Sequence, residues 1–280
     1  MEPPRARVSP AGSRHTGPRN PDQRNHRVPE LSPALVLFLT AVLLFGGFAK
    51  GTIGFGLIVT TVPFLSMVMP PSAAMAWMAI PIFLLNLYAI ALTWAEWRAF
   101  RRVAIFLFMG ILFVPAGVRL VVWMPAGITR AGIGVFILIV VAMRLGGLEP
   151  AKIAGMGARW VSALWGCAAG LIHGSLMMPA PPIVLYLNFS GVPKDAFVFL
   201  ISTVAASFLL VQVITFASLD SYTSGAGWQS LLMLAPATLG TWLGNRFRQT
   251  LSQTIFERLV MGLLGIVGIS LLAKNLVGLF

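Results

Sequence analysis

The sequence has little of what soluble enzymes use for catalysis and metal binding. Of its 280 residues, one is cysteine, three are histidine and eight are acidic. The single cysteine, Cys167, rules out an intramolecular disulfide and a cysteine metal cluster. The sequence also lacks an HExxH motif, a nucleotide-binding loop and paired carboxylates within an apolar segment. These absences argue against an enzyme and against a metal or organic cofactor.

Charge is scarce as well, since only 10% of the residues are charged and 58% are hydrophobic. A soluble domain of this size with that balance would expose large apolar patches, so the composition predicts an integral membrane protein. The apolar segments are about 17 to 30 residues long, which is typical of membrane helices and not of barrel strands. We therefore expect an all-α, polytopic membrane protein.

The net charge of +12 does not indicate a nucleic-acid partner, because the basic residues cluster in the N-terminal segment and between the apolar blocks. Residues 1–30 hold six arginines and six prolines with few large apolar side chains, which predicts a disordered basic tail. The tail is long for a signal peptide and no small-residue cleavage site follows it, so we expect the first helix to be retained.

Eight apolar blocks follow the tail, and two of them are too long for one crossing. A straight helix over residues 33–66 would span about 50 Å, against a hydrocarbon core of about 30 Å. The first and fifth blocks are therefore expected to break, tilt or re-enter. The blocks are 33–68, 72–95, 103–122, 129–146, 160–187, 195–217, 228–244 and 255–277.

The two long blocks are related, which predicts an internal duplication into two homologous four-helix repeats, residues 31–152 and 153–280. A shift of 119 residues superimposes glycines and a proline of the two blocks. Sequence leaves open whether the repeats are parallel or inverted. The matched positions are Gly47 with Gly166, Gly51 with Gly170 and Pro63 with Pro182.

Lysine and arginine are more frequent in the loops on the N-terminal side of the eight crossings, thirteen against six. The positive-inside rule then places the N-terminus in the cytoplasm.

The stretch GFAKGTIGFG, residues 47–56, places Lys50 inside an apolar run. An unpaired lysine in the membrane costs at least about 2.5–3.5 kcal/mol, which favours a functional role. The surrounding glycines predict a broken helix, whose free N–H groups bind anions. We therefore predict a substrate site at Lys50, Gly51, Gly54 and Gly56. Two alternatives stay open: Lys50 could reach the membrane interface along its stem, and the glycines could serve helix packing.

The corresponding stretch in the fifth block is GLIHGSLMMPAPP, residues 170–182. His173 is the one histidine outside the tail, and it could hold an anion or carry a coupling proton, or pack as a hydrogen-bonded core residue. We include His173, Gly174 and Ser175 in the predicted substrate site. A serine hydrolase is disfavoured because no G-x-S-x-G frame surrounds Ser175. Asn86, Ser202, Thr203, Ser207 and Gln212 could line a cavity or bond between helices.

The two glycine-rich stretches resemble the TauE/SafE family of sulfite and organosulfur anion exporters. The resemblance rests on G51-T-I-G54-F-G56 ending in V62-P63, on its echo G170-L-I-H173-G174 ending in Pro182, and on the 4+4 layout. It implies a multi-pass carrier of the cell (inner) membrane with two homologous halves. The chain departs from the family pattern where His173, Met177 and Met178 replace small residues.

The expected function is therefore secondary transport of a small anion such as sulfite or an organosulfonate, by alternating access, with the lipid bilayer as surroundings and a proton as a possible coupling ion. The alternative is a carrier or channel for another small metabolite, in which Lys50 is structural. A cation carrier would need an acidic residue inside a block, whereas the acids of the membrane region lie at block boundaries. These acids are Glu96, Glu149, Asp195, Asp220 and Glu257.

Overall fold

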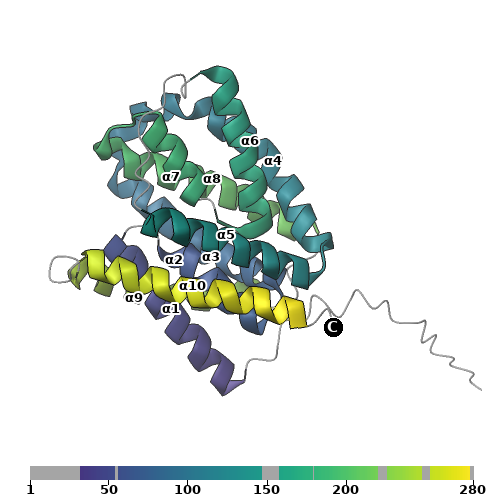
Figure 1. The fold of residues 1–280 in the computed structure, drawn as a ribbon. Helices are drawn as coiled ribbons and strands as arrows, with labels where there is room; N and C mark the ends of the chain where they lie inside the picture. Colours follow the sequence, from purple (N-terminus) through teal and green to yellow (C-terminus); the bar gives the residue numbers. More distant parts are fainter. Residues whose placement is uncertain are drawn as a thin grey trace, which may run out of the picture.

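The chain folds into a bundle of helices (Figure 1). The computed structural model describes residues 32–53, 56–146, 158–178, 180–219, 226–247 and 253–277, and the regular structure in these ranges is entirely helical. This confirms the all-α prediction. The elements are α1 (Pro33–Ile53), α2 (Gly56–Val68), α3 (Pro71–Leu92), the 3₁₀ helix η2 (Trp94–Arg102), α4 (Ala104–Trp123), α5 (Ala126–Leu145), α6 (Arg159–Leu176), α7 (Ala180–Phe189), α8 (Lys194–Ser218), α9 (Ala226–Phe247) and α10 (Gln253–Val277).

The outer faces of these helices are apolar, as in a protein surrounded by lipid. Five described segments are long and apolar enough to cross a membrane, which agrees with a polytopic membrane protein. Eight crossings stay a prediction. The five segments are Pro33–Thr52, Pro71–Leu92, Ala104–Trp123, Ala126–Met143 and Ala196–Ser218. Outward-facing side chains include Phe108, Leu112, Ile139, Leu164, Ile214 and Ile266.

Both overlong apolar blocks break, as their lengths predict. In the first block α1 ends at Ile53 and α2 begins at Gly56, and in the fifth block α6 ends at Leu176 and α7 begins at Ala180. Met177 closes α6 in the left-handed conformation, with φ of 54°, and its N–H donates to the carbonyl of His173 at 2.7 Å. A left-handed non-glycine residue costs roughly 1–2 kcal/mol.

The first break turns the chain back on itself. Gly46 of α1 lies against three side chains of α2, because a Cβ added there would come within 3.3 Å of each of them. In a straight helix, Gly46 and Leu57 would be about 16 Å apart along the axis. The segment α1–α2 is therefore a hairpin of helices rather than one long crossing. The three α2 residues are Leu57, Thr60 and Thr61.

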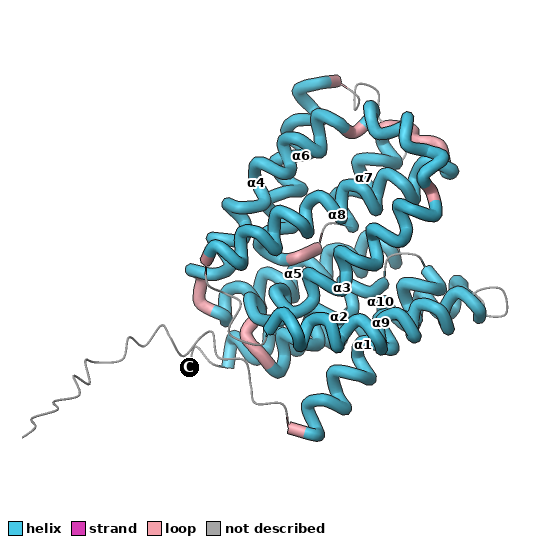
Figure 2. Tube along the Cα trace, turned by 180° about the vertical axis from the view of Figure 1, so that it is seen from behind, coloured by secondary structure: helices cyan, strands magenta, loops and turns pink. Residues whose placement is uncertain are grey.

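Glycines allow two helix pairs to approach until their backbones touch, α1 with α9 and α4 with α6. A Cβ on Gly51 would meet the backbone of Gly244 at 2.9 Å, and a Cβ on Gly170 would meet that of Gly110 at 2.8 Å. Figures 1 and 2 show α4 and α6 side by side, away from the group formed by α1, α9 and α10. Each broken helix therefore packs on a helix from the other half of the sequence. These contacts support helix packing, one of the two roles that the sequence leaves open for Gly47 and Gly51.

Helix boundaries in the two halves correspond at a shift of 123 residues. This shift carries the end of α1 at Ile53 onto the end of α6 at Leu176. It also carries Pro70 onto Pro193, and these prolines precede α3 and α8 with similar backbone angles (φ −57°, ψ 137° and φ −59°, ψ 146°). The structural shift exceeds the 119 residues suggested by glycine and proline spacing by about one helical turn.

Candidate functional site

Lys50 lies in the last turn of α1, three residues before the first break. It follows Gly46 by four residues and so shares the helix face that packs against α2. Its side chain is half-buried, and the described residues provide no acidic partner for it. The carbonyl end of α1 favours the positive charge, and the first turn of α2 offers N–H groups to an anion.

His173 lies at the matching position of the second break, three residues before the end of α6. Its imidazole is fully buried and packs on Phe208 of α8, with ring centroids 5.5 Å apart. Gln212, one turn further along α8, is also fully buried and adjoins the imidazole. Neither ring nitrogen of His173 and neither amide atom of Gln212 has a hydrogen bond of good geometry, although the two side chains lie close enough to interact with each other.

Four unpaired polar atoms in one buried place are costly, since each such group costs about 1–3 kcal/mol. Native structures keep few of them, and a ligand or water that pairs with them is the usual reason. Asn86, Thr203 and Ser207, by contrast, each donate to a carbonyl of their own helix at 2.7–2.8 Å. The sequence could not tell which of these polar residues line a cavity and which bond within the helices. The structure favours Gln212 as a candidate for the cavity.

The shift of 123 residues aligns Lys50 with His173, so the two polar side chains of the breaks occupy equivalent positions. The residues two positions after Lys50 and His173 also make equivalent hydrogen bonds. Thr52 donates to Phe48 at 2.7 Å, and Ser175 donates to Leu171 at 2.8 Å. A shift of 119 residues would instead align His173 with Gly54.

The remaining predicted site residues make structural contacts or lie outside the described residues, and their role in a substrate site stays a prediction. Gly51 and Gly174 face the backbones of α9 and α4, which accounts for glycine at both positions by helix packing. The hydroxyl of Ser175 is used within α6. Gly56 begins α2, and Gly54 lies outside the described residues.

The two breaks lie on helices with different main neighbours. The main neighbours of α1 are α2 and α9, whereas α6 packs on α4, α7 and α8. We therefore describe two half-sites: a first half-site at α1–α2 with Lys50, and a second half-site at α6–α8 with His173 and Gln212. That the two breaks form one substrate site stays a prediction.

Comparison with known proteins identifies the family of the chain. The family model described as "Sulfite exporter TauE/SafE" matches residues 39–271, which include both breaks and both half-sites. The chain belongs to the TauE/SafE family. Its members are membrane transporters of sulfur-containing anions, so the match supports a multi-pass membrane protein with a transport function. No curated protein and no solved structure matches the chain.

Proposed function

We propose that this TauE/SafE family member is a secondary transporter that exports a small anion such as sulfite or an organosulfonate. The observation that carries the proposal is the equivalence of Lys50 and His173 at two helix breaks. Lys50 carries a positive charge and His173 an imidazole, and each is followed along the chain by the N–H end of the next half-helix. This combination suits a ligand of negative charge. No acidic side chain among the described residues accompanies either of them, which disfavours a cation as cargo.

The proposed mechanism uses the two half-sites in turn. Lys50 and the N–H groups at the start of α2 hold the anion at the first half-site, and His173 with Gln212 hold it at the second. Rocking of one repeat, residues 31–152, against the other, residues 153–280, would expose the half-sites to opposite sides of the membrane. The contacts of α1 with α9 and of α6 with α4 would be the surfaces that move.

We further propose a proton as the coupling ion, because His173 is the one histidine among the described residues and imidazole is a common proton carrier in proteins. The protein would lie in the cell membrane with its N-terminus, residues 1–30, in the cytoplasm. That tail lies outside the described residues. The runner-up remains a carrier or channel for another small metabolite, in which Lys50 only stabilises the end of α1.

Replacement of Gln212 by leucine separates a transport role from a packing role. Because leucine removes two unpaired polar atoms from a buried place, the apparent Tm of Gln212→Leu should be equal to or above that of the wild type. Efflux of sulfite from proteoliposomes should nevertheless fall at least tenfold.

The matched control is Gln212→Asn, which keeps the amide and should retain more flux than leucine. Equal flux in wild type and Gln212→Leu would remove Gln212 from the proposed site. A lower Tm with unchanged flux would assign it to packing.

A further inference from the structure

The helix η2, Trp94–Arg102, has a surface that the proposed transport function does not use. It joins α3 to α4, and the segments on either side of it, Pro71–Leu92 and Ala104–Trp123, are both long and apolar enough to cross a membrane. A link between two such spans lies at the membrane surface, where the hydrocarbon core meets the headgroups. None of the nine side chains of η2 is buried. The helix is therefore placed where it can contact lipid headgroups.

The 3₁₀ winding of η2 sorts its side chains into three rows, because residues three apart lie directly above one another. One row holds Trp94, Trp97 and Phe100, which are 62%, 51% and 38% exposed. The next row holds Arg98 and Arg101, which are also exposed. In an α-helix, which turns by about 100° per residue, Arg101 would instead fall between Trp94 and Trp97. The 3₁₀ winding thus separates the aromatic side chains from the guanidinium groups.

The third row of η2 faces the protein. Glu96 and Ala99 in this row are half-buried, and Ala99 packs against the apolar core. At the start of η2 the ring of Trp94 meets Phe199 of α8 edge-on, with centroids 6.3 Å apart. These contacts hold η2 in one orientation, with the other two rows directed away from the bundle.

The charge of η2 is positive, since it has three arginines and one acid. The guanidinium of Arg98 lies over the ring of Trp97, 5.6 Å from its centroid, which is the geometry of a cation–π pair. Arg101 and Arg102 are exposed side by side in the last turn, whereas Glu96 lies in the row that faces the protein. Arginine binds phosphate oxygens through two parallel N–H groups, so this pair suits a phosphate.

We propose that η2 is a binding surface for anionic phospholipids. Trp97 and Phe100 lie at the upper end of the acyl chains, and Arg101 and Arg102 bind headgroup phosphates. A soluble anion would use the arginines but leave the aromatic row in water, whereas a lipid satisfies both rows at once. A zwitterionic headgroup offsets its phosphate with its own cation, so η2 should prefer lipids of net negative charge. This surface is distinct from the two half-sites.

The test uses a fluorophore on η2 in the full-length protein. Ala95 is exposed and shares the row of Arg98 and Arg101. In a Cys167→Ser, Ala95→Cys background, the thiol would be labelled with nitrobenzoxadiazole and the protein reconstituted in phosphatidylcholine nanodiscs. These would contain, at equal mole fraction, phosphatidylglycerol or phosphatidylcholine with a nitroxide high on one acyl chain. The nitroxide quenches a fluorophore that it contacts, and the phosphatidylglycerol form should quench at least twofold more.

Charge variants show whether the arginine pair causes this preference. Arg101→Gln combined with Arg102→Gln should make quenching by the two lipids equal, whereas lysine at both positions should retain a preference. The matched control is Arg119→Gln combined with Arg246→Gln, which removes the same charge from exposed positions on α4 and α9 and should leave the preference unchanged.

Three results would overturn the proposal. The first is equal quenching by both lipids when Arg101 and Arg102 are present, and the second is an unchanged preference in the double glutamine variant. The third is no quenching by either lipid, which would show that another protein, such as a second copy of this chain, covers η2. None of these measurements uses flux, so the lipid surface can fail while the proposed transport function stands, and the reverse.

Discussion

Replacement of Lys50 by methionine should reduce sulfite flux in proteoliposomes at least tenfold while the protein still folds. Methionine keeps the length and the apolar stem of the side chain but removes the charge, so the packing of α1 on α2 is preserved. Because an unpaired charge at this depth opposes membrane insertion, its removal should not lower the apparent Tm. Lys50→Arg should retain a measurable fraction of the flux.

The matched control is Arg98→Gln, which removes a positive charge from η2, where Arg98 stacks on Trp97 at 5.6 Å, far along the chain from either break. Its flux should equal that of the wild type. Full flux in Lys50→Met would show that the charge serves the end of α1 and would leave His173 and Gln212 as the remaining candidates for the site.

Replacement of Gly170 by alanine should strongly destabilise the protein, although it adds a single methyl group. The added Cβ would overlap the carbonyl oxygen of Gly110, and the two helices would have to move apart along their whole contact. Overpacking of a tight core costs typically about 1–3 kcal/mol, and a backbone clash belongs at the upper end of that range. The apparent Tm should fall by roughly 6–12 °C.

Gly262→Ala is the matched control, because a Cβ there meets nothing within 4 Å. The substitution is chemically identical and also lies within a helix, so its Tm should stay level or rise slightly. Thermal unfolding followed by tryptophan fluorescence would measure both variants. Equal Tm values for Gly170→Ala and Gly262→Ala would contradict the close contact of α4 and α6.

The helix breaks could be predicted because they follow from length and composition. An apolar run that exceeds the membrane thickness must break, and glycine and proline mark where the helix is weakest. The positions of the breaks, after Ile53 and Leu176, agree with that reasoning. The roles of Gly47 and Gly51 were left open by the sequence, because helix breaks and helix packing use the same residue type.

The equivalence of Lys50 and His173 could not be read from glycine spacing. Glycines that serve packing recur about every four residues along a helix, so a repeat aligned on them can slip by one turn without losing its matches. Helix ends and the paired hydrogen bonds of Thr52 and Ser175 remove that ambiguity. The position of Gln212 beside His173 depends on how α8 packs on α6, which no local pattern encodes.

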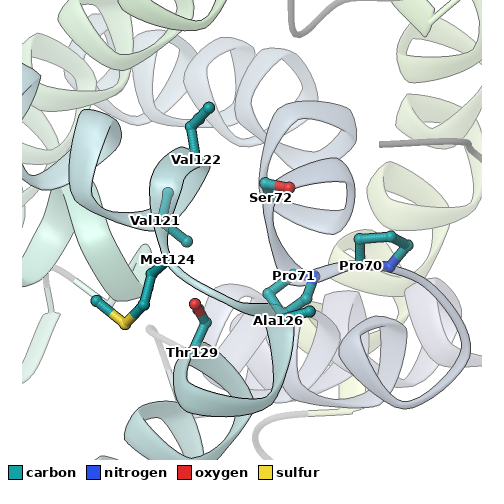
Figure 3. Close-up of a pocket in the computed structure, with 8 residues that line it drawn as sticks. All are labelled: Pro70, Pro71, Ser72, Val121, Val122, Met124, Ala126 and Thr129. Carbon is teal, nitrogen blue, oxygen red and sulfur yellow. The ribbon is translucent and has the colours of Figure 1, made fainter. Parts of the chain in front are cut away.

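A small pocket between the starts of α3 and α5 was also hidden from sequence analysis (Figure 3). Its hydroxyls belong to residues that are common in membrane helices. The one available signal is that Pro70–Pro71 and Pro125 each precede a helix start, with a serine or a threonine within the first turns. The starts of α3 and α5 come close together only in the folded protein.

The most direct test of anion transport is the substrate range of the wild-type protein in sealed proteoliposomes. Vesicles loaded with sulfite would be diluted into anion-free buffer, with and without a pH gradient, and compared with vesicles loaded with sulfoacetate, chloride or choline. We predict saturable efflux of the sulfur anions, acceleration by a pH gradient, and no flux of choline. Choline flux, or the absence of sulfite and sulfoacetate efflux from vesicles that contain folded protein, would contradict the proposed function.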